Sequence, residues 1–418
     1  MFSAAEFLTY LESAYKSNPV LNASRENYKA IKENVNISKS EFLPSISVTG
    51  SQSSQQNSNR MNQTGVILPD NSNNSEIQSV SVDQKIFQGF HGYNSIKKSK
   101  LESDQAALEL KNTEQQILLK SATAYYDLVY KIKNTKFNLS NVDLFERQVE
   151  SNSSRVQKGE ITLTDLAQSE SSLAGANAKF IAAENELLAA KSNFERIIRL
   201  PAPEKIVTDK FIKNISLNFP ISINAALAYS EKNNPKLLLA KLDYKISEKN
   251  VDIEKSKFSP TASINYTQSQ NKDFSSSVNE VDQETLKATV TIPLFKGGEN
   301  YSSLKKSKFK KEQSNLILQD TVNEIKTDTI NSWSAYQSSE SVLKATQAQV
   351  KAAEIANEGI TLEYDSGNTR TTLEVIQSRS LLLEARISNA AAERNFAISK
   401  FELLAIIGEL TLENLKRS

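Results

Sequence analysis

Apolar residues recur at helical spacing over most of the chain, and the longest runs follow a seven-residue repeat. The first long run reaches from about residue 93 to about residue 157, and its apolar positions step by four and three: Leu118, Ala122, Tyr125, Val129 and Ile132. Past Gly159 the apolar residues stand seven apart: Leu166, Leu173, Phe180, Leu187 and Phe194. A sustained period of 3.5 residues predicts helices that pair along narrow seams instead of enclosing a thick core. About sixty helical residues would reach roughly 90 Å.

Alternating polar and apolar residues predict four short strands inserted between these helices. They are residues 45–49, 80–87, 261–267 and 285–295. Polar loops are expected over 50–76 and around 269–282, where Ser, Asn and Gln dominate. About ten alternating residues is the length of a tilted strand that spans a bilayer. Four strands cannot close a barrel, and an open edge in lipid leaves backbone groups unpaired, so membrane strands would need further copies of the chain.

The order of elements occurs twice. The motif Asn18-Pro19 recurs 216 residues later as Asn234-Pro235. The turn segment that contains Asp165 recurs 209 residues later as the segment that contains Glu374. Further pairs are Phe42-x-Pro44 with Phe258-x-Pro260 and Phe87-x-Gly89 with Phe295-x-Gly297. We therefore expect two structural repeats, residues 1–204 and 205–418. Each reads helix, β-hairpin (44–90 and 258–298), long helix, turn (near 159 and 367) and helix.

Composition excludes several classes of protein. With 50 Lys and Arg against 49 Asp and Glu, the chain lacks the basic surface of a nucleic-acid binder. It has no cysteine, so thiolate chemistry, disulfides and a lipidated cysteine are unavailable. No nucleophile–base pair, phosphate loop or metal-ligand spacing stands out, so we expect no enzyme activity, cofactor or metal. The first residues lack a basic region followed by an apolar core, which leaves open a chain without a signal peptide or a trimmed one.

These motifs, in this order and occurring twice, resemble the TolC family of outer-membrane efflux proteins of Gram-negative bacteria over about residues 3–408. The resemblance implies a mainly α-helical fold with a small β part, completed only as a homotrimer. Four strands from each protomer would form one twelve-stranded barrel in the outer membrane, and the helices one tunnel through the periplasm. Residues 205–224 and 408–418 would lie in an equatorial region.

The resemblance also implies the function and the partners. The chain would be a passive exit duct for drugs, small molecules or secreted proteins, located in the outer membrane and extending into the periplasm. It would work with a periplasmic adaptor protein and an inner-membrane pump or ABC transporter. A coiled-coil scaffold or adaptor-like protein without a channel is the alternative, and the four strands are the feature that separates the two.

The family's periplasmic gate assigns roles to residues at the two turns. We expect contacts of Tyr364 with Asp165 and of Arg370 with Thr164 to hold the tunnel closed. Glu374 takes the position of an acidic pore ring, and Gln377 stands where a second acid often occurs. Residues 367–370 make the second turn one residue longer than the family pattern, which leaves the register of Arg370 and Glu374 open by one position.

Other residues are expected to contact the partners. The turns at Gly159 and Gly367 would dock the adaptor. A set of aromatic residues would lie at the membrane interface: Phe87, Phe90, Tyr93 and Phe295. Glycine just past a helix end and threonines at the next start are also ordinary helix stop and start signals, so the turn residues have a purely structural interpretation as well.

Overall fold

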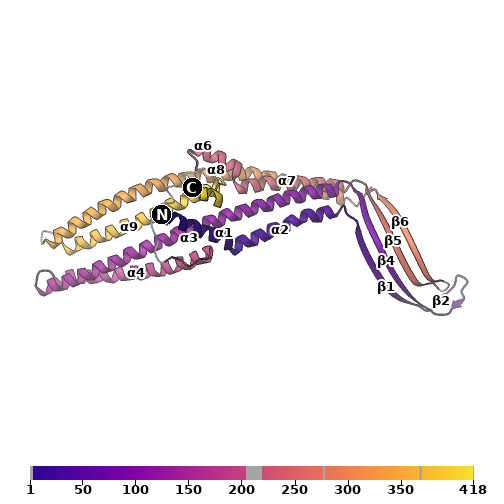
Figure 1. Cartoon of the computed structure of the whole chain (residues 1–418), viewed down its shortest axis with the longest axis horizontal. Helices are drawn as coiled ribbons and strands as arrows, with labels where there is room; N and C mark the ends of the chain where they lie inside the picture. The colour runs from indigo at the N-terminus through magenta and orange to yellow at the C-terminus, as the bar shows by residue number, and fades with distance from the viewer. Residues whose placement is uncertain (1–2, 204–218, 276–277, 367–369, 418) are drawn as a thin grey trace. The chain divides into compact units, whose positions relative to one another are not determined.

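Long helices, a four-stranded sheet and a small two-stranded sheet make up the computed structural model, which describes residues 3–203, 219–275, 278–366 and 370–417 (Figure 1). The predicted class, mainly α with a small β part, is confirmed. The helices are α1 (Ser3–Ser17), α2 (Pro19–Ser40), α3 (His91–Gln157), α4 (Leu163–Ile198), α6 (Ile223–Asn233), α7 (Pro235–Ser256), α8 (Glu299–Asp365), α9 (Thr372–Ile406) and α10 (Leu412–Arg417). The strands are β1 (Ser45–Asn57), β2 (Arg60–Met61), β3 (Ile67–Leu68), β4 (Asn71–Gln88), β5 (Thr261–Ser275) and β6 (Val278–Thr291).

The chain forms two compact units, and α2, α3, α7 and α8 each contribute residues to both. The first unit comprises residues 1–26, 108–239 and 319–418, and the second comprises 27–107 and 240–318. In the part of the chain that the structure describes, no helix combines the length and the apolar composition needed to cross a membrane.

The two Asn-Pro motifs have the same structural role in the first unit. The Asn18 side-chain oxygen accepts hydrogen bonds from the amides of Val20 and Leu21, at 3.0 and 3.4 Å, and so caps α2. Its amide group donates to the carbonyl of Ile197 at the end of α4, at 3.1 Å. Proline suits the first helical position because its missing N–H would have no partner there.

Asn234 repeats this arrangement at the start of α7. It accepts from Leu237 at 3.0 Å and donates to the carbonyl of Ile406 at 2.8 Å. Each asparagine thus caps one helix and satisfies an orphan carbonyl at the end of another.

The core of the first unit gathers aromatic residues from distant parts of the chain. The Phe7 ring lies 4.8 Å from that of Tyr125 and 5.9 Å from that of Phe401, so α1 joins α3 and α9. The segment after Gly408 packs into this core. Leu410 and Leu415 are 0% and 1% exposed, because they cover apolar surface that would otherwise meet water.

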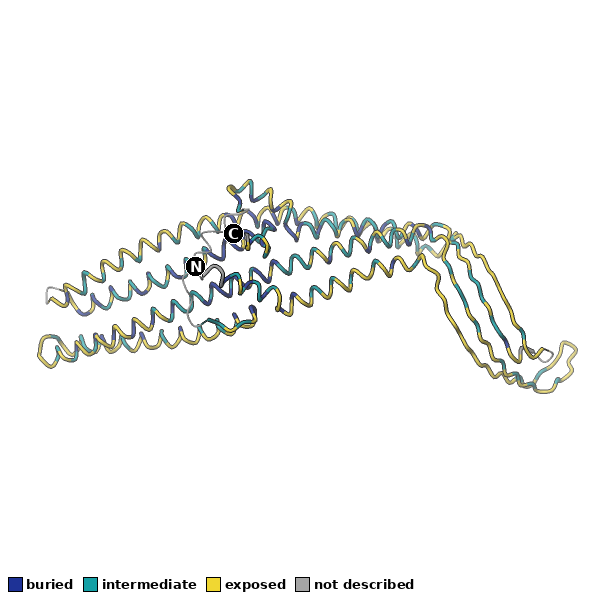
Figure 2. Tube along the Cα trace, viewed as in Figure 1, coloured by how far each residue is buried: buried dark blue, intermediate teal, exposed yellow. Residues whose placement is uncertain are grey.

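The second unit contains a four-stranded antiparallel sheet in the order β1-β4-β5-β6. Hydrogen bonds join its helices in the matching order α2, α3, α7 and α8: Ser38 with Ser99 at 2.5 Å, Gln105 with Asp243 at 2.7 Å, and Lys311 with Glu248 at 2.8 Å. The outer strands β1 and β6 are exposed along nearly their whole length (Figure 2).

The strand register makes this sheet amphipathic. Directly opposite residues lie on the same face of a sheet. One row across the four strands is apolar or aromatic: Ile46, Val82, Tyr266 and Leu286. The next row lies on the other face and is polar throughout: Ser47, Ser81, Thr267 and Thr285. One face therefore carries an apolar row and the opposite face carries hydroxyl groups.

The predicted polar loops were largely wrong. The first hairpin continues to Asn57 and resumes at Asn71, and the second continues to Ser275 and resumes at Val278. Serine, asparagine and glutamine have weak strand preference, but an unbroken ladder of backbone hydrogen bonds with a neighbouring strand overrides it. The fourth strand ends at Thr291, not at residue 295, and Pro293 without an N–H follows.

Candidate functional site

Two helical turns of the first unit carry most of the residues that the sequence singled out. One turn joins α3 to α4 and the other joins α8 to α9. Each second helix begins with a capping box, Thr162 with Asp165 in α4 and Thr371 with Glu374 in α9. In both, the threonine hydroxyl accepts from the backbone N–H of the acid, and the carboxylate accepts from the backbone N–H of the threonine. Glu374 is thus the structural counterpart of Asp165, since each is the third residue of its helix and closes the capping box.

Below each turn, a polar pair joins the two helices of the hairpin. Asn152 donates from its amide to the hydroxyl of Ser169 at 2.7 Å. The hydroxyl of Ser378 donates to the side-chain oxygen of Asn357 at 2.9 Å. These pairs replace an apolar contact in the heptad seam, and a polar residue at such a position fixes the axial alignment of two helices at some cost in stability.

Asn152 is the centre of a buried network that also reaches the other hairpin. It is 0% exposed, and its side-chain oxygen accepts from Gln148 at 2.9 Å and from the hydroxyl of Tyr364 at 3.0 Å. The Tyr364 hydroxyl lies 3.1 Å from that of Thr372, and the Tyr364 ring lies under the Arg155 guanidinium, 4.7 Å from its centroid. Tyr364 is 6% exposed. The network therefore joins α3, α4, α8 and α9 through hydrogen bonds shielded from water.

Further polar contacts link α3 to α9. Arg379 donates to the carbonyl of Leu144 at 3.3 Å. Burial lowers the pKa of the Arg379 guanidinium from its ordinary value, although arginine stays charged at any physiological pH. Two ion pairs lie along the same helices, Lys133 with Glu393 and Arg394 with Asp127.

The two predicted closing contacts do not form in the structure. Tyr364 bonds to Asn152 and Thr372 instead of Asp165, whose carboxylate is occupied by Thr162 at 2.7 Å. Arg370 does not bond to Thr164. Its guanidinium donates to Glu363 at 2.6 Å and to Glu374 at 2.9 Å, because both carboxylates flank its own turn.

The Glu374 carboxylate accepts hydrogen bonds from the Thr371 backbone and from the Arg370 guanidinium. The backbone N–H of Thr371, then the guanidinium of Arg370, lower the pKa of its carboxyl group. The hydrogen bonds that the Arg370 guanidinium donates to Glu363, and then to Glu374, raise its pKa from the ordinary value. Gln377 is exposed one turn further along α9. Glu374 thus combines a helix cap with an ion pair at the surface of the turn.

Gly159 has the left-handed conformation expected of a glycine at a helix end, with φ of 74°. The amide of Gly159 donates to Val156 and that of Glu160 to Arg155, both at 2.9 Å, which satisfies two carbonyls at the end of α3. Apart from its chain neighbours, none of the described residues has an atom within 4 Å of where a side chain on Gly159 would begin. Gly367 lies outside the described residues.

The predicted interface aromatics belong to the second unit, at the junctions of strands and helices. The rings of Phe87 and Phe90 meet edge to face at 5.5 Å, and Lys97 lies 4.3 Å from the centroid of Tyr93. Phe295 is 86% exposed. Contact of these residues with a membrane stays a prediction.

Asn152 was missed by the sequence-based selection, although a signal was present. It stands seven residues after Phe145 and fourteen after Asn138, which places it on the buried seam of α3. A polar residue in an apolar heptad frame marks a specific contact. The spacing identifies the position, but not that Tyr364 is the partner.

Comparison with known proteins agrees with this architecture. The profile of the family described as "Outer membrane efflux protein" matches residues 10–198 and 227–409. The outer membrane efflux protein BepC of Brucella suis biovar 1 (strain 1330) is 25% identical over 410 residues, which are 97% of this chain and 86% of BepC. The outer membrane protein TolC of Escherichia coli (strain K12) is 20% identical over 424 residues, 99% of this chain and 84% of TolC.

Among solved structures, the CmeC outer membrane channel of Campylobacter jejuni has the same fold. It superposes with a TM-score of 0.84 at 15% identity, covering 97% of this chain and 86% of CmeC. Since the family profile matches most of the chain, the protein belongs to the family of outer membrane efflux proteins that includes TolC.

Proposed function

We propose that this protein is a passive exit duct of the outer membrane, formed by three copies of the chain. The observation that carries the proposal is the amphipathic sheet with two unpaired edges. Among the described residues, β1 and β6 each pair on one side only. An open edge in lipid is costly, so strands of this kind need closure by neighbouring copies, and three copies supply twelve strands.

The composition of the sheet supports insertion in lipid. The row of Ile46, Val82, Tyr266 and Leu286 would face the hydrocarbon, and the hydroxyl row of Ser47, Ser81, Thr267 and Thr285 would line a water-filled interior. Strands of 13 to 18 residues exceed the nine to eleven or so that a bilayer requires. A coiled-coil scaffold without a channel would have no use for such a sheet.

The two helical turns are proposed as the periplasmic gate. The buried bond between Tyr364 and Asn152 holds the hairpins together, and Arg370 braces the second turn through Glu363 and Glu374. The hydrogen bond between Tyr364 and Asn152 is costly to break because both side chains are buried, and a polar group left unpaired there has no water to replace its partner. Thr164 and Asp165 would belong to the gate at the start of α4, where Asp165 is the acid of the capping box.

Opening requires partners outside the chain. A periplasmic adaptor would dock on the turns at Gly159 and Gly367, and an inner-membrane pump or ABC transporter would drive drugs, small molecules or proteins through the duct. Three Glu374 carboxylates, with Gln377 one turn away, would form a weak cation-attracting ring near the gate. Residues 1–204 and 205–418 are proposed as two structural repeats, with 205–224 and 408–418 in the equatorial region.

Planar-bilayer recording of the purified full-length protein tests this function. We expect small cation-selective single-channel currents and a detergent-solubilised trimer by light scattering. A protein that remains monomeric in water without detergent and gives no conductance would contradict the proposal.

A further inference from the structure

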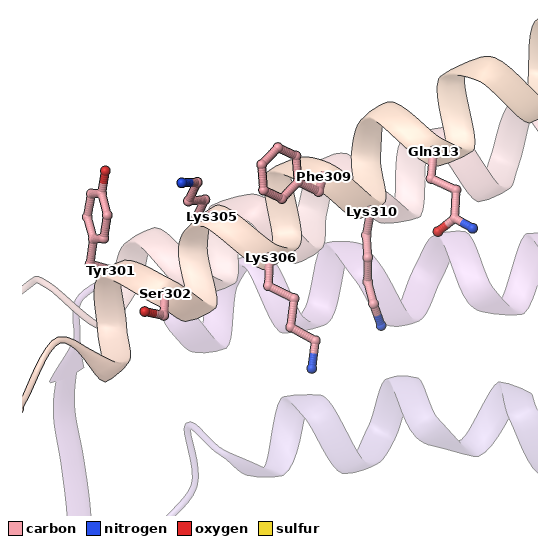
Figure 3. A pocket seen from close by; sticks show the side chains of 7 residues that line it. All are labelled: Tyr301, Ser302, Lys305, Lys306, Phe309, Lys310 and Gln313. Atoms are coloured by element: carbon pink, nitrogen blue, oxygen red, sulfur yellow. The ribbon is translucent and has the colours of Figure 1, made fainter.

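The first turns of α8 carry an unusual combination of lysines and exposed aromatic rings. Figure 3 shows the side chains of Tyr301, Lys305 and Phe309 directed to one side of the helix, and those of Lys306 and Lys310 directed to another. Residues four and eight apart stand in one row along a helix. Tyr301 and Phe309 are 68% and 65% exposed. Together these residues line a shallow depression of about 470 Å³, within the size range of small-ligand sites.

Four of the lysines on these turns have no carboxylate partner in the part of the chain that the structure describes: Lys305, Lys306, Lys308 and Lys310. Lys311 provides the contrast, since it pairs with Glu248 at 2.8 Å. That hydrogen bond lowers the pKa of the Glu248 carboxyl group, as expected for a formed ion pair. The other four ammonium groups are left available for an anionic partner.

A second copy of the chain does not supply an obvious acidic surface for this patch. The helical stretches of the second unit, 27–40, 91–107, 240–256 and 299–318, contain fifteen lysines against nine acidic residues. Where neighbouring copies adjoin in the proposed trimer, these surfaces bring an excess of positive charge together, so they do not neutralise the patch. Charge complementarity therefore favours a partner from outside the protein.

In the sequence, the lysines and aromatic residues at the start of α8 come shortly after β6, the last strand of the sheet proposed to lie in lipid. On the way from β6 to α8 the chain exposes Leu294 by 91% and Phe295 by 86%. An apolar surface followed by aromatic rings and then by lysines matches the change from hydrocarbon to headgroups at a membrane boundary. Lysines close to a membrane surface attract anionic lipids, each contributing independently of precise geometry.

We propose that the start of α8 binds anionic phospholipid headgroups, with Lys305, Lys306 and Lys310 contacting the phosphate groups and Tyr301 and Phe309 lying at the headgroup level. This inference rests on the proposed membrane function. The lysine site adds a preference for anionic lipids. The sheet alone does not require this preference, since its apolar residues would contact the acyl chains of zwitterionic and anionic lipids equally.

Native mass spectrometry of the detergent-solubilised full chain, titrated with phosphatidylglycerol or phosphatidylcholine, tests the proposal. We expect preferential retention of phosphatidylglycerol. The triple variant K305Q/K306Q/K310Q should lose this preference by on the order of tenfold, and K305R/K306R/K310R should keep it. The control K179Q/K326Q/K351Q removes three exposed lysines from helices of the first unit and should leave the preference unchanged.

The outcomes separate this inference from the proposed function. Equal retention of both lipids by the natural sequence, or an equal loss in the control, would overturn the lipid site. Protection of Lys305, Lys306 and Lys310 from chemical modification in lipid-free trimers would overturn it as well, in favour of an interface between copies. Single-channel recording in a purely zwitterionic bilayer is independent of the lipid site, so absence of currents there would count against the duct itself.

Discussion

The hydroxyl of Tyr364 donates a 3.0 Å hydrogen bond to the side-chain oxygen of Asn152, joining α8 to α3 across 212 residues of sequence. Both side chains are buried, so neither group can exchange its partner for water. This contact connects the two helical hairpins, and a change at either end tests whether it holds the proposed gate closed.

Asn152→Ala should raise the open probability in single-channel recordings. The substitution leaves the Tyr364 hydroxyl and the Ser169 hydroxyl without their shared partner, at a cost of about 1–3 kcal/mol to the closed state. Asn138→Ala is the matched control. Among the described residues, the Asn138 side-chain amide donates to Asn134 alone, within α3, at 2.9 and 3.1 Å, so its loss should leave opening unchanged.

Tyr364→Phe should also raise the open probability. Combined with Asn152→Ala, it should raise the open probability no further than Asn152→Ala does alone. The ring and its contact with Arg155 remain, and only the hydroxyl is lost. A double-mutant cycle on open probability measures this coupling. Independent, additive effects of the two substitutions would show that the hydrogen bond is not what holds the hairpins together.

Arg370→Gln should increase cation selectivity, and Glu374→Gln should decrease it. Removing the guanidinium frees the carboxylates of Glu363 and Glu374, which it contacts at 2.6 and 2.9 Å. Free carboxylates near a pore attract cations. Reversal potentials in asymmetric salt measure both changes, and identical values for the two variants would place this turn away from the ion path.

Acidic pH should loosen the start of α9. The folded protein lowers the pKa of Glu374, chiefly through the backbone N–H of Thr371 and then through Arg370, so this stabilisation is complete above the ordinary carboxyl pKa of about 4.3. It is lost as the pH falls below that value through the lowered pKa. We expect open probability to rise at such pH, and the Glu374-specific part of the rise to be absent in Glu374→Gln.

Gly408→Ala should lower the melting temperature, whereas Gly175→Ala should raise it. Gly408 has φ of 76°, and a side-chain carbon there would meet the carbonyl oxygen of Asn233 at 2.2 Å. The strained conformation alone costs about 1–2 kcal/mol. Gly175 lies within α4, and no atom of the described residues comes within 4 Å of where its side chain would begin, so alanine there should add about 0.5–1 kcal/mol of helix stability. Thermal unfolding in detergent measures both.

Much of the helical framework could be predicted because it depends on neighbouring residues. The Asn-Pro pairs, the glycine at 159 and the paired threonines mark helix ends through caps that reach only three or four positions. The heptad spacing predicted long paired helices for the same reason. Residues 50–57 and 71–76, by contrast, were expected as loop, since their polar side chains give no alternation and only pairing with a neighbouring strand extends them.

The sequence alone thus determined where the helices begin and end, which faces pair, and that two similar turns close the hairpins. Tertiary structure alone decided the partner of Tyr364. The capping box occupies Asp165 locally, while the axial offset of α8 against α3 brings Asn152 to the tyrosine hydroxyl. That offset is set by packing summed over whole helices, and no local spacing in the sequence specifies it.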